Sequence, residues 1–389
     1  MSTAEPGVTP VTTPARVGWI LTVTLVNLGT FVAFFGPIAV LLPMQSEALR
    51  PHSKEATLAL ITGLGAAISL VANPLFGAFS DRTTSRRGRR VPWITIGTLG
   101  GALGLSILAG ATQLWHVILG WCLVQAAVNA SLAAITATLP DRVPVEQRAT
   151  AGGMVSLGQT LGILVGAGLA IAFGGYRAGY AACAVFLVLS ALPYLRRPND
   201  LTITSAPKFD VREFLGSFWL SPLKHPDFGW AWLTRFVVNL GNGIATLYLL
   251  FFLDDAVGLD DPENGVFVVI AINSVVVAIS AVIAGRMSDK VGKRKIFVIW
   301  AGVIMAVDLA IVTEVLPDEA GFAKDLGVIN IANSLPQVIA PVIAAVIVTS
   351  LGGYTMLYSV AAVIGLIGAV AVVKIKSITT QETDLNEHL

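Results

Sequence analysis

Runs of apolar residues long enough to cross a lipid bilayer constrain this chain more than any other feature. Eleven stretches carry few charges, and each is roughly 20 residues long, the length that an α-helix needs to span the hydrocarbon core. Only 13% of the residues are charged and 55% are hydrophobic, which leaves too little charge to cover a water-soluble domain. The runs are too long and too uniformly apolar for barrel strands, so we expect an all-α membrane protein. The expected spans are 17–44, 57–80, 92–112, 115–139, 149–173, 178–195, 228–253, 264–287, 296–316, 327–350 and 355–373.

The basic residues predict on which side of the membrane each loop lies. Lys and Arg on short loops stay in the cytoplasm during insertion. With the N-terminus placed inside, the outer loops up to residue 295 hold only Arg50, Lys54 and Arg177. All other Lys and Arg of that stretch fall on the inner side, apart from Arg235 within a span. We therefore expect a multi-pass protein of the cell membrane with a cytoplasmic N-terminus.

The polar ends and the cysteines exclude several classes of protein. Residues 1–16 are rich in Pro and Thr and lack the apolar core of a secretory signal, so we expect a disordered cytosolic tail, with a second polar tail at 374–389. Cys122 and Cys183 both lie in apolar spans, so neither a disulfide nor a metal site is indicated. A net charge of +1 suggests no attraction to nucleic acid.

A glycine- and arginine-rich motif occurs twice. The first copy is "GAFSDRTTSRRGRR" at 77–90, and the second is "GRMSDKVGKRK" at 285–295. Each follows the second apolar span of its half of the chain, which indicates an internal duplication. The glycine lets a neighbouring helix approach, the aspartate can meet the positive N-terminal end of that helix, and the arginines can pair with carboxylates of the other half. The motif therefore predicts a releasable cytosolic gate, made of Gly77, Asp81, Arg82, Gly88, Arg89, Arg90, Gly285, Asp289, Lys290, Gly292 and Arg294.

The doubled motif resembles the signature of the major facilitator superfamily of secondary transporters. In that family two six-helix bundles rock about a central site, and the Asp and Arg of the signature stabilise the outward-open state. The resemblance implies these roles for Asp81 with Arg82, Arg89 and Arg90, and for the matching residues of the second copy. The longer first loop, "SDRTTSRRGRRVPW", is also similar to that of sucrose–proton symporters and the related glycoside–pentoside–hexuronide carriers, which implies a sugar as one candidate solute.

The two halves differ by one span. Residues 196–227 form a polar linker between a six-helix bundle at 17–195 and a second bundle at 228–373. An "LPD" sequence follows a later span in each half, at 139–141 and at 316–318. Two spans separate the glycine- and arginine-rich motif from "LPD" in the first half, but only one span separates them in the second half. We infer a deletion near 305–310 that fused two helices of the usual pattern. The alternative is a different topology after residue 316.

Amides within the spans are candidates for solute contact. Buried amides in a membrane must face protein or water, so they point inward, where some bind solute and others join helices. The candidates are Asn27, Gln125, Asn129, Gln159, Asn239, Asn242, Asn273, Asn333 and Gln337. Asp308 is the clearest carboxylate inside a span and the candidate for proton coupling, unless it lies near a helix end.

These features favour a carrier over an enzyme. No Walker loop or catalytic triad is present in the sequence, which argues against an enzyme and an ATP-driven pump. We expect a monomeric secondary transporter of a small polar organic solute that works by alternating access and uses a proton gradient, with no cofactor. The alternatives are a multidrug exporter and a degenerate carrier-like protein that no longer transports.

Overall fold

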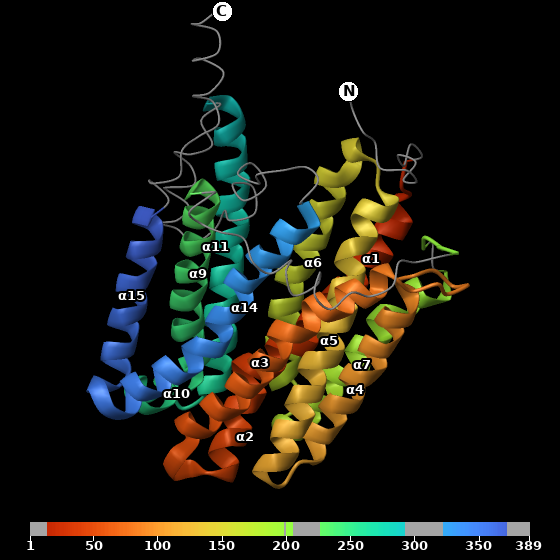
Figure 1. Ribbon diagram of the computed structural model, residues 1–389. Coiled ribbons are helices and arrows are strands. Elements are labelled where there is room, and N and C mark those ends of the chain that lie inside the picture. Colours follow the sequence, from red (N-terminus) through yellow and green to blue (C-terminus); the bar gives the residue numbers. More distant parts are fainter. Residues whose placement is uncertain (1–13, 198–199, 205–225, 292–321, 372–389) are drawn as a thin grey trace, which may run out of the picture. The chain divides into compact units, whose positions relative to one another are not determined.

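The computed structural model describes residues 14–197, 200–204, 226–291 and 322–371, and every element in these ranges is helical (Figure 1). Seven of the described helices are long and apolar enough to cross a membrane, or up to eight if the bent pair Trp232–Leu247 and Leu249–Val257 is one span. The all-helical membrane class is therefore confirmed. The predicted span 296–316 and the predicted deletion lie outside the described residues.

The chain divides into two compact units, residues 1–37 with 71–208 and residues 38–70 with 209–389. The long helix α3 (Lys54–Asp81) contributes to both. The other helices of the first unit are α1 (Val17–Gly36), α4 (Val91–Gly110), α5 (Leu114–Arg142), α6 (Val145–Ile171) and α7 (Tyr176–Arg196). The second unit contains most of η1 (Pro37–Leu41), and α2 (Leu42–Leu49), η2 (Pro51–Ser53), α9 (Pro226–Leu247), α10 (Leu249–Phe251), η3 (Phe252–Val257), α11 (Pro262–Val291), α14 (Phe322–Val346), η5 (Ile347–Gly352) and α15 (Gly353–Ala371).

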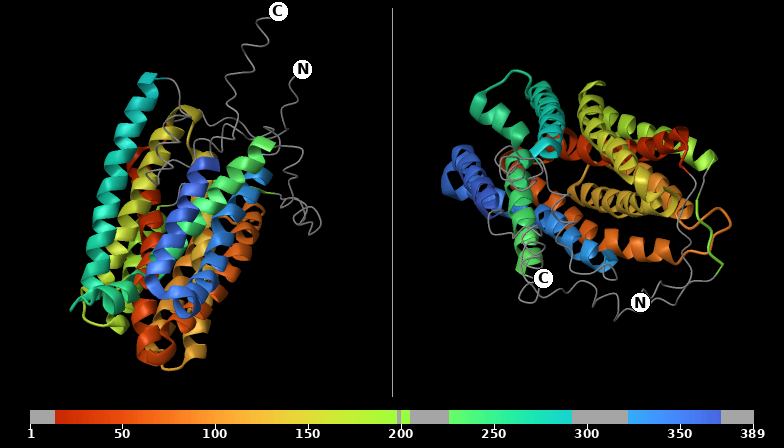
Figure 2. Two further views of the ribbon diagram at one scale, coloured as in Figure 1. Left: turned by 90° about the vertical axis from the view of Figure 1, so that its left-hand side faces the viewer. Right: turned by 90° about the horizontal axis from the view of Figure 1, so that it is seen from above.

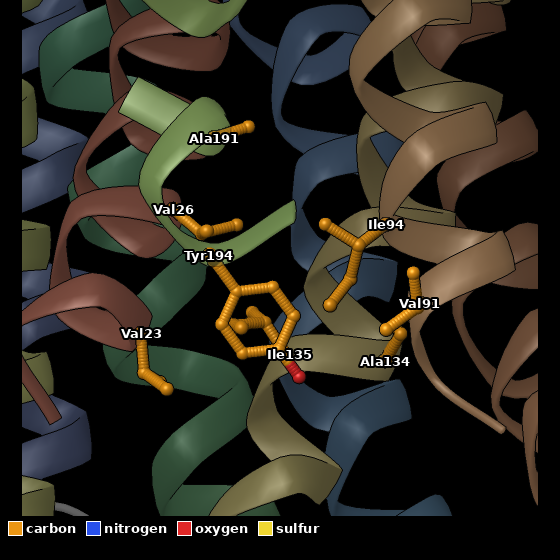
Figure 3. Close-up of a cluster of buried hydrophobic side chains, with 8 residues drawn as sticks. All are labelled: Val23, Val26, Val91, Ile94, Ala134, Ile135, Ala191 and Tyr194. Carbon is orange, nitrogen blue, oxygen red and sulfur yellow. The ribbon is translucent and has the colours of Figure 1, made fainter. Parts of the chain in front are cut away.

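The core of the first unit lies where four of its helices meet. Tyr194 of α7 is fully buried there, and its ring lies among aliphatic side chains from α1, α4 and α5 (Figure 3). Trp19 and Trp93 cover this cluster at its edge. In a membrane such interfaces gain stability from close packing more than from the removal of water, so the fit of the side chains matters here. The cluster consists of Val23, Val26, Val91, Ile94, Ala134, Ile135, Ala191 and Tyr194.

A stripe of glycines brings α6 against the backbone of α1. Gly162 and Gly166 lie four residues apart on α6, a spacing that permits close packing. A Cβ atom on Gly162 would lie 2.7 Å from the carbonyl oxygen of Leu28, and one on Gly166 would lie 2.9 Å from the amide nitrogen of Gly36. Both distances are shorter than real Cβ contacts, so only glycine allows this approach.

The outward faces of the helices are apolar. On α4, Leu99 and Leu103 are one turn apart and 59% and 58% exposed. On α7, Val185 and Leu189 are each 58% exposed at the same spacing. A surface of this kind is a liability in water but matches the hydrocarbon of a bilayer, which supports the assignment of these helices as membrane spans.

In the second unit, α9 packs against both α14 and α15 (Figure 2). The span predicted at 228–253 is not one straight helix, because it bends by 45° at Tyr248 and continues into the π-helical η3. The Tyr248 hydroxyl donates a hydrogen bond of 3.0 Å to the backbone carbonyl of Glu55. The bend lies one turn before η3, and Asp254 and Asp255 of η3 contact Lys54 at the start of α3.

Candidate functional site

The first copy of the motif forms the end of α3 and the loop that leads into α4. The loop depends on Gly88, whose φ of +106° falls in the region that L side chains rarely adopt. A Cβ atom on Gly88 would also lie 2.3 Å from the side chain of Asp200. Thr83 ties the loop to α4, since its hydroxyl accepts a hydrogen bond of 2.8 Å from the indole of Trp93.

Arg90 is the centre of the ionic contacts. Its side chain is only 3% exposed, and it lies 2.6 Å from a carboxylate oxygen of Asp81 and 2.9 Å from one of Asp141. The guanidinium also donates a hydrogen bond of 3.0 Å to the Ser80 hydroxyl. Burial alone would lower the pKa of Arg90, but Asp141 and Asp81 outweigh it and raise the pKa above its ordinary value, so Arg90 stays charged.

Asp141, at the end of α5, binds two arginines. Arg89 donates hydrogen bonds to both carboxylate oxygens of Asp141, in the paired geometry that a guanidinium favours. The Asp141 side chain is 11% exposed, whereas that of Asp81 is 54% exposed. Asp141 is therefore the main counter-charge of the cluster formed by Asp81, Arg89, Arg90 and Asp141, which we call the arginine network.

Asp200 fixes the start of α4 from the segment that follows α7. Its carboxylate accepts hydrogen bonds of 2.7 Å and 3.1 Å from the backbone amides of Arg90 and Val91. A carboxylate is stabilising at a helix N-terminus, where amide donors have no partner within the helix. The amide of Arg89 donates to the carbonyl of Leu201 at 2.9 Å. The beginning of the predicted linker is thus joined to the motif loop.

The remaining gate residues of the first copy have simpler surroundings. Arg82 donates to the backbone carbonyl of Ala78, four residues earlier, at 3.1 Å. A Cβ atom on Gly77 would lie 3.9 Å from that of Ala133, an ordinary contact, so the helix approach at this point does not depend on glycine. In the second copy, Gly285, Asp289 and Lys290 lie on α11. Their side chains, and Gly292 and Arg294, lie outside the described part of the structure.

Asp141 and Asp200 were not identified as site residues from the sequence. A sequence pattern does mark Asp141, because this residue belongs to the repeated "LPD" sequence, but the repeat indicates only how the two halves align. Asp200 had no signal beyond its position in a polar linker. Both lie far from the motif along the chain, 51 and 110 residues from Arg90, so only the fold brings them together.

Three of the amide candidates are buried in the first unit and take part in hydrogen bonds between or within helices. Asn27 of α1 donates to the carbonyl of Val155 on α6 at 2.9 Å. Asn129 donates to the carbonyl of Gln125 at 2.8 Å and accepts from Asn73 of α3 at 3.2 Å. These contacts hold helices together, the role that buried amides most often have in membranes.

The other described candidates are less buried. Asn239 is half-buried and donates to the carbonyl of Arg235 at 2.9 Å. Four more amides are exposed on long apolar helices. The side chain of Asn333 and the whole of Asp308 lie outside the described residues. The exposed candidates are Gln159 on α6, Asn242 on α9, Asn273 on α11 and Gln337 on α14.

Comparison with protein families gives one match over most of the chain. Residues 21–312 match the family described as Major Facilitator Superfamily. The multidrug resistance protein MdtG of Salmonella typhimurium is 24% identical over 298 residues, which cover 73% of this chain and 70% of that protein. MdtG of Proteus mirabilis is 23% identical over 312 residues, 77% of this chain and 75% of that protein.

Solved structures of transporters share the fold. A peptide transporter POT in complex with sulfate aligns with a TM-score of 0.72 at 13% identity, covering 92% of this chain and 96% of that one. A mutant of the nucleoside transporter NupG aligns with a TM-score of 0.67 at 11% identity, covering 92% and 99%. At these identities the likeness shows the fold alone.

Proposed function

The chain belongs to the major facilitator superfamily and is therefore a membrane transporter rather than an enzyme, and from this premise we propose that it moves a small polar organic solute by alternating access, coupled to protons. The two bodies that rock are the bundles at 17–195 and 228–373, joined by the linker 196–227. The N-terminus is cytoplasmic, and a single copy of the chain is sufficient for transport.

One observation carries the choice of a polar solute. Gln159, Asn242, Asn273 and Gln337 are exposed on apolar helices. An amide that faces hydrocarbon leaves its hydrogen-bonding groups without partners, which costs several kcal/mol on apolar-transfer scales, roughly 4–8. Such residues persist where a water-filled cavity or a polar ligand meets them. A sugar fits this chemistry, since its hydroxyls donate to and accept from amides.

In this mechanism the arginine network stabilises the cytosolic gate. Asp81 is the half-exposed member and the one that a second partner can reach, while Asp141 keeps Arg89 and Arg90 in place. We assign the release step to Asp81 and the corresponding role in the second half to Asp289. Asp308 remains our candidate for proton coupling.

A second candidate function is the export of hydrophobic drugs. The relatives named above are multidrug resistance proteins, at 23–24% identity. In addition, the buried amides of the first unit are bonded to other helix groups, as Asn27 is to Val155. A binding cavity lined mainly by apolar and aromatic side chains would favour this function.

Counterflow in proteoliposomes separates the two functions. Vesicles containing the full-length protein are loaded with one unlabelled solute, and uptake of its labelled form is measured for a panel of sugars, amino acids and hydrophobic cations. We expect transient labelled accumulation with polar solutes and none in protein-free vesicles. Accumulation with the hydrophobic cations alone would establish the exporter instead. No counterflow with any compound, from monodisperse protein, would contradict transport itself.

A further inference from the structure

Lys54, the first residue of α3, is buried among three carboxylates. Its ammonium group lies 2.8 Å from Glu47 of α2, 2.9 Å from Asp255 and 3.5 Å from Asp254, both of η3. The Lys54 side chain is 9% exposed, whereas each of the three carboxylates is 37–39% exposed. Along the sequence, Glu47 and Lys54 follow the first predicted span and Asp254 and Asp255 follow the seventh, but the fold gathers them around one cation. We call Lys54, Glu47, Asp254 and Asp255 the Lys54 cluster.

Aromatic side chains of the second half complete this arrangement. Lys54 lies 4.8 Å from the centre of the Phe251 ring, within the range of a cation–π interaction. The Tyr354 hydroxyl of α15 contacts Asp255 at 2.8 Å and Glu55 at 3.2 Å. Side chains from α2, the start of α3, η3 and α15 therefore contact one another in one place. Two of these segments come from the first half of the sequence and two from the second.

The charges of the cluster do not balance. One lysine faces three carboxylates, so the cluster carries a net charge of 1 − 3 = −2. With Lys54 present, each carboxylate has an opposite charge within 3.5 Å. Without it, the carboxylates on α2 and η3 repel one another, and water can reach them because they are partly exposed. The ionic part of the attraction between the start of α3 and η3 thus comes from Lys54, beside the hydrogen bonds that Tyr248 and Tyr354 make with Glu55.

We propose that Lys54 is a gating residue. Its ionic contacts hold the hairpin formed by α2 and the first part of α3 (residues 38–70) against η3, and these contacts must break when this end of the transporter opens. The proposal rests on transport by alternating access. It extends that function by naming the contact that closes the end carrying the 50–53 and 254–263 loops, which the positive-inside pattern places outside the cell. α3 then carries a gate contact at each end, Lys54 at its first residue and Asp81 at its last.

The test measures how readily a buried position beside the cluster becomes accessible. Ser46 precedes Glu47 on α2 and is fully buried, so Ser46→Cys is a conservative reporter. It is introduced into the full-length protein with Cys122→Ser and Cys183→Ser, and its reaction with a hydrophilic maleimide is timed in detergent micelles. This assay needs neither a solute nor flux, so its result is independent of the counterflow experiment.

Lys54→Met is expected to speed this labelling about tenfold, because a cation is removed from partners that it alone neutralises. The matched control is Arg50→Met, which removes an exposed cation from the same hairpin. Arg50→Met should leave the rate unchanged, and Lys54→Arg should restore it to near that of the parent. Equal rates in Lys54→Met and Arg50→Met, with both proteins monodisperse, would overturn the proposal.

A second variant separates gating from a general loss of packing. Combining Lys54→Met with Glu47→Gln, Asp254→Asn and Asp255→Asn removes the repulsion along with the attraction, so labelling should be slower than in Lys54→Met alone. A merely structural role for Lys54 predicts that the added substitutions speed labelling further. If Lys54→Met does not yield monodisperse protein, Asp255→Asn alone should speed labelling about threefold through the loss of one paired charge, and no acceleration would overturn the proposal.

Discussion

Asp141→Asn is expected to lower the free energy of unfolding by about 3 kcal/mol, since it leaves the buried Arg90 and the partly buried Arg89 without their main counter-charge. The Arg90 side chain is 3% exposed, so water cannot replace the lost carboxylate there, whereas Arg89, 17% exposed, is reached by some water. The effect is measured by reversible unfolding of the purified protein in mixed detergent micelles. The loss of helical signal is followed as denaturant is added, and it gives the free energy of unfolding of each protein.

The matched control for this prediction is Asp81→Asn in the same network. Because the Asp81 side chain is 54% exposed, its ion pair with Arg90 is worth about 0.5 kcal/mol. Asp81→Asn should therefore keep stability while it alters transport, if Asp81 forms the releasable contact. Equal destabilisation by the two substitutions would show that Asp141 is not the central counter-charge.

Gly166→Leu is expected to prevent folding of the first unit. A Cβ atom at this position would lie 2.9 Å from the amide nitrogen of Gly36 and 3.2 Å from the Cα atom of Val32. Both are backbone atoms of α1, which cannot rotate away as a side chain could. Even Gly166→Ala should cost about 3 kcal/mol, the upper range for overpacking. The yield of monodisperse protein by size-exclusion chromatography checks the first variant, and unfolding in micelles checks the second.

Gly153→Ala on the same helix provides the control for Gly166. No atom lies within 4 Å of a Cβ atom built at Gly153. Alanine favours the helix over glycine by about 0.8–1 kcal/mol, so this variant should be as stable as the parent or slightly more so. A well-folded Gly166→Leu protein would mean that α1 and α6 do not pack as closely as the structure shows.

The helices of the first unit could be predicted closely from the sequence. The expected span 92–112 corresponds to α4 at Val91–Gly110, and 178–195 corresponds to α7 at Tyr176–Arg196. Long apolar runs define these helices because the bilayer fixes their length and their backbones must satisfy their own hydrogen bonds. The Gly162 and Gly166 pair was also predictable, since small residues four apart fall on one helix face.

Irregular backbone within the spans was harder to predict. The run 17–44 contains the π-helical η1 at Pro37–Leu41, and the run 228–253 bends at Tyr248. A proline, Pro37, begins the first of these irregular segments. No proline or other sequence signal marks the second, because the bend accompanies contacts such as that of Tyr248 with Glu55, which are distant along the chain.

The ionic contacts could be predicted from the sequence less well than the helices, because their partners are brought together only by the fold. The duplicated motif identified Arg89, Arg90 and Asp81, yet it did not identify Asp141 or Asp200 as their partners. The sequence places Lys54 on an outer loop, where a charged residue is usually exposed. Its burial follows from the meeting of four segments that no local pattern connects.

The central claim, proton-coupled transport, is tested most directly by imposing a pH gradient on proteoliposomes and measuring the steady-state distribution of the solute found by counterflow. With one proton moved per solute, the inside and outside concentrations should differ by about tenfold per pH unit, because one pH unit stores 1.36 kcal/mol for each proton. A protonophore should abolish the difference. Equal concentrations on both sides, with the gradient intact and counterflow still active, would contradict proton coupling.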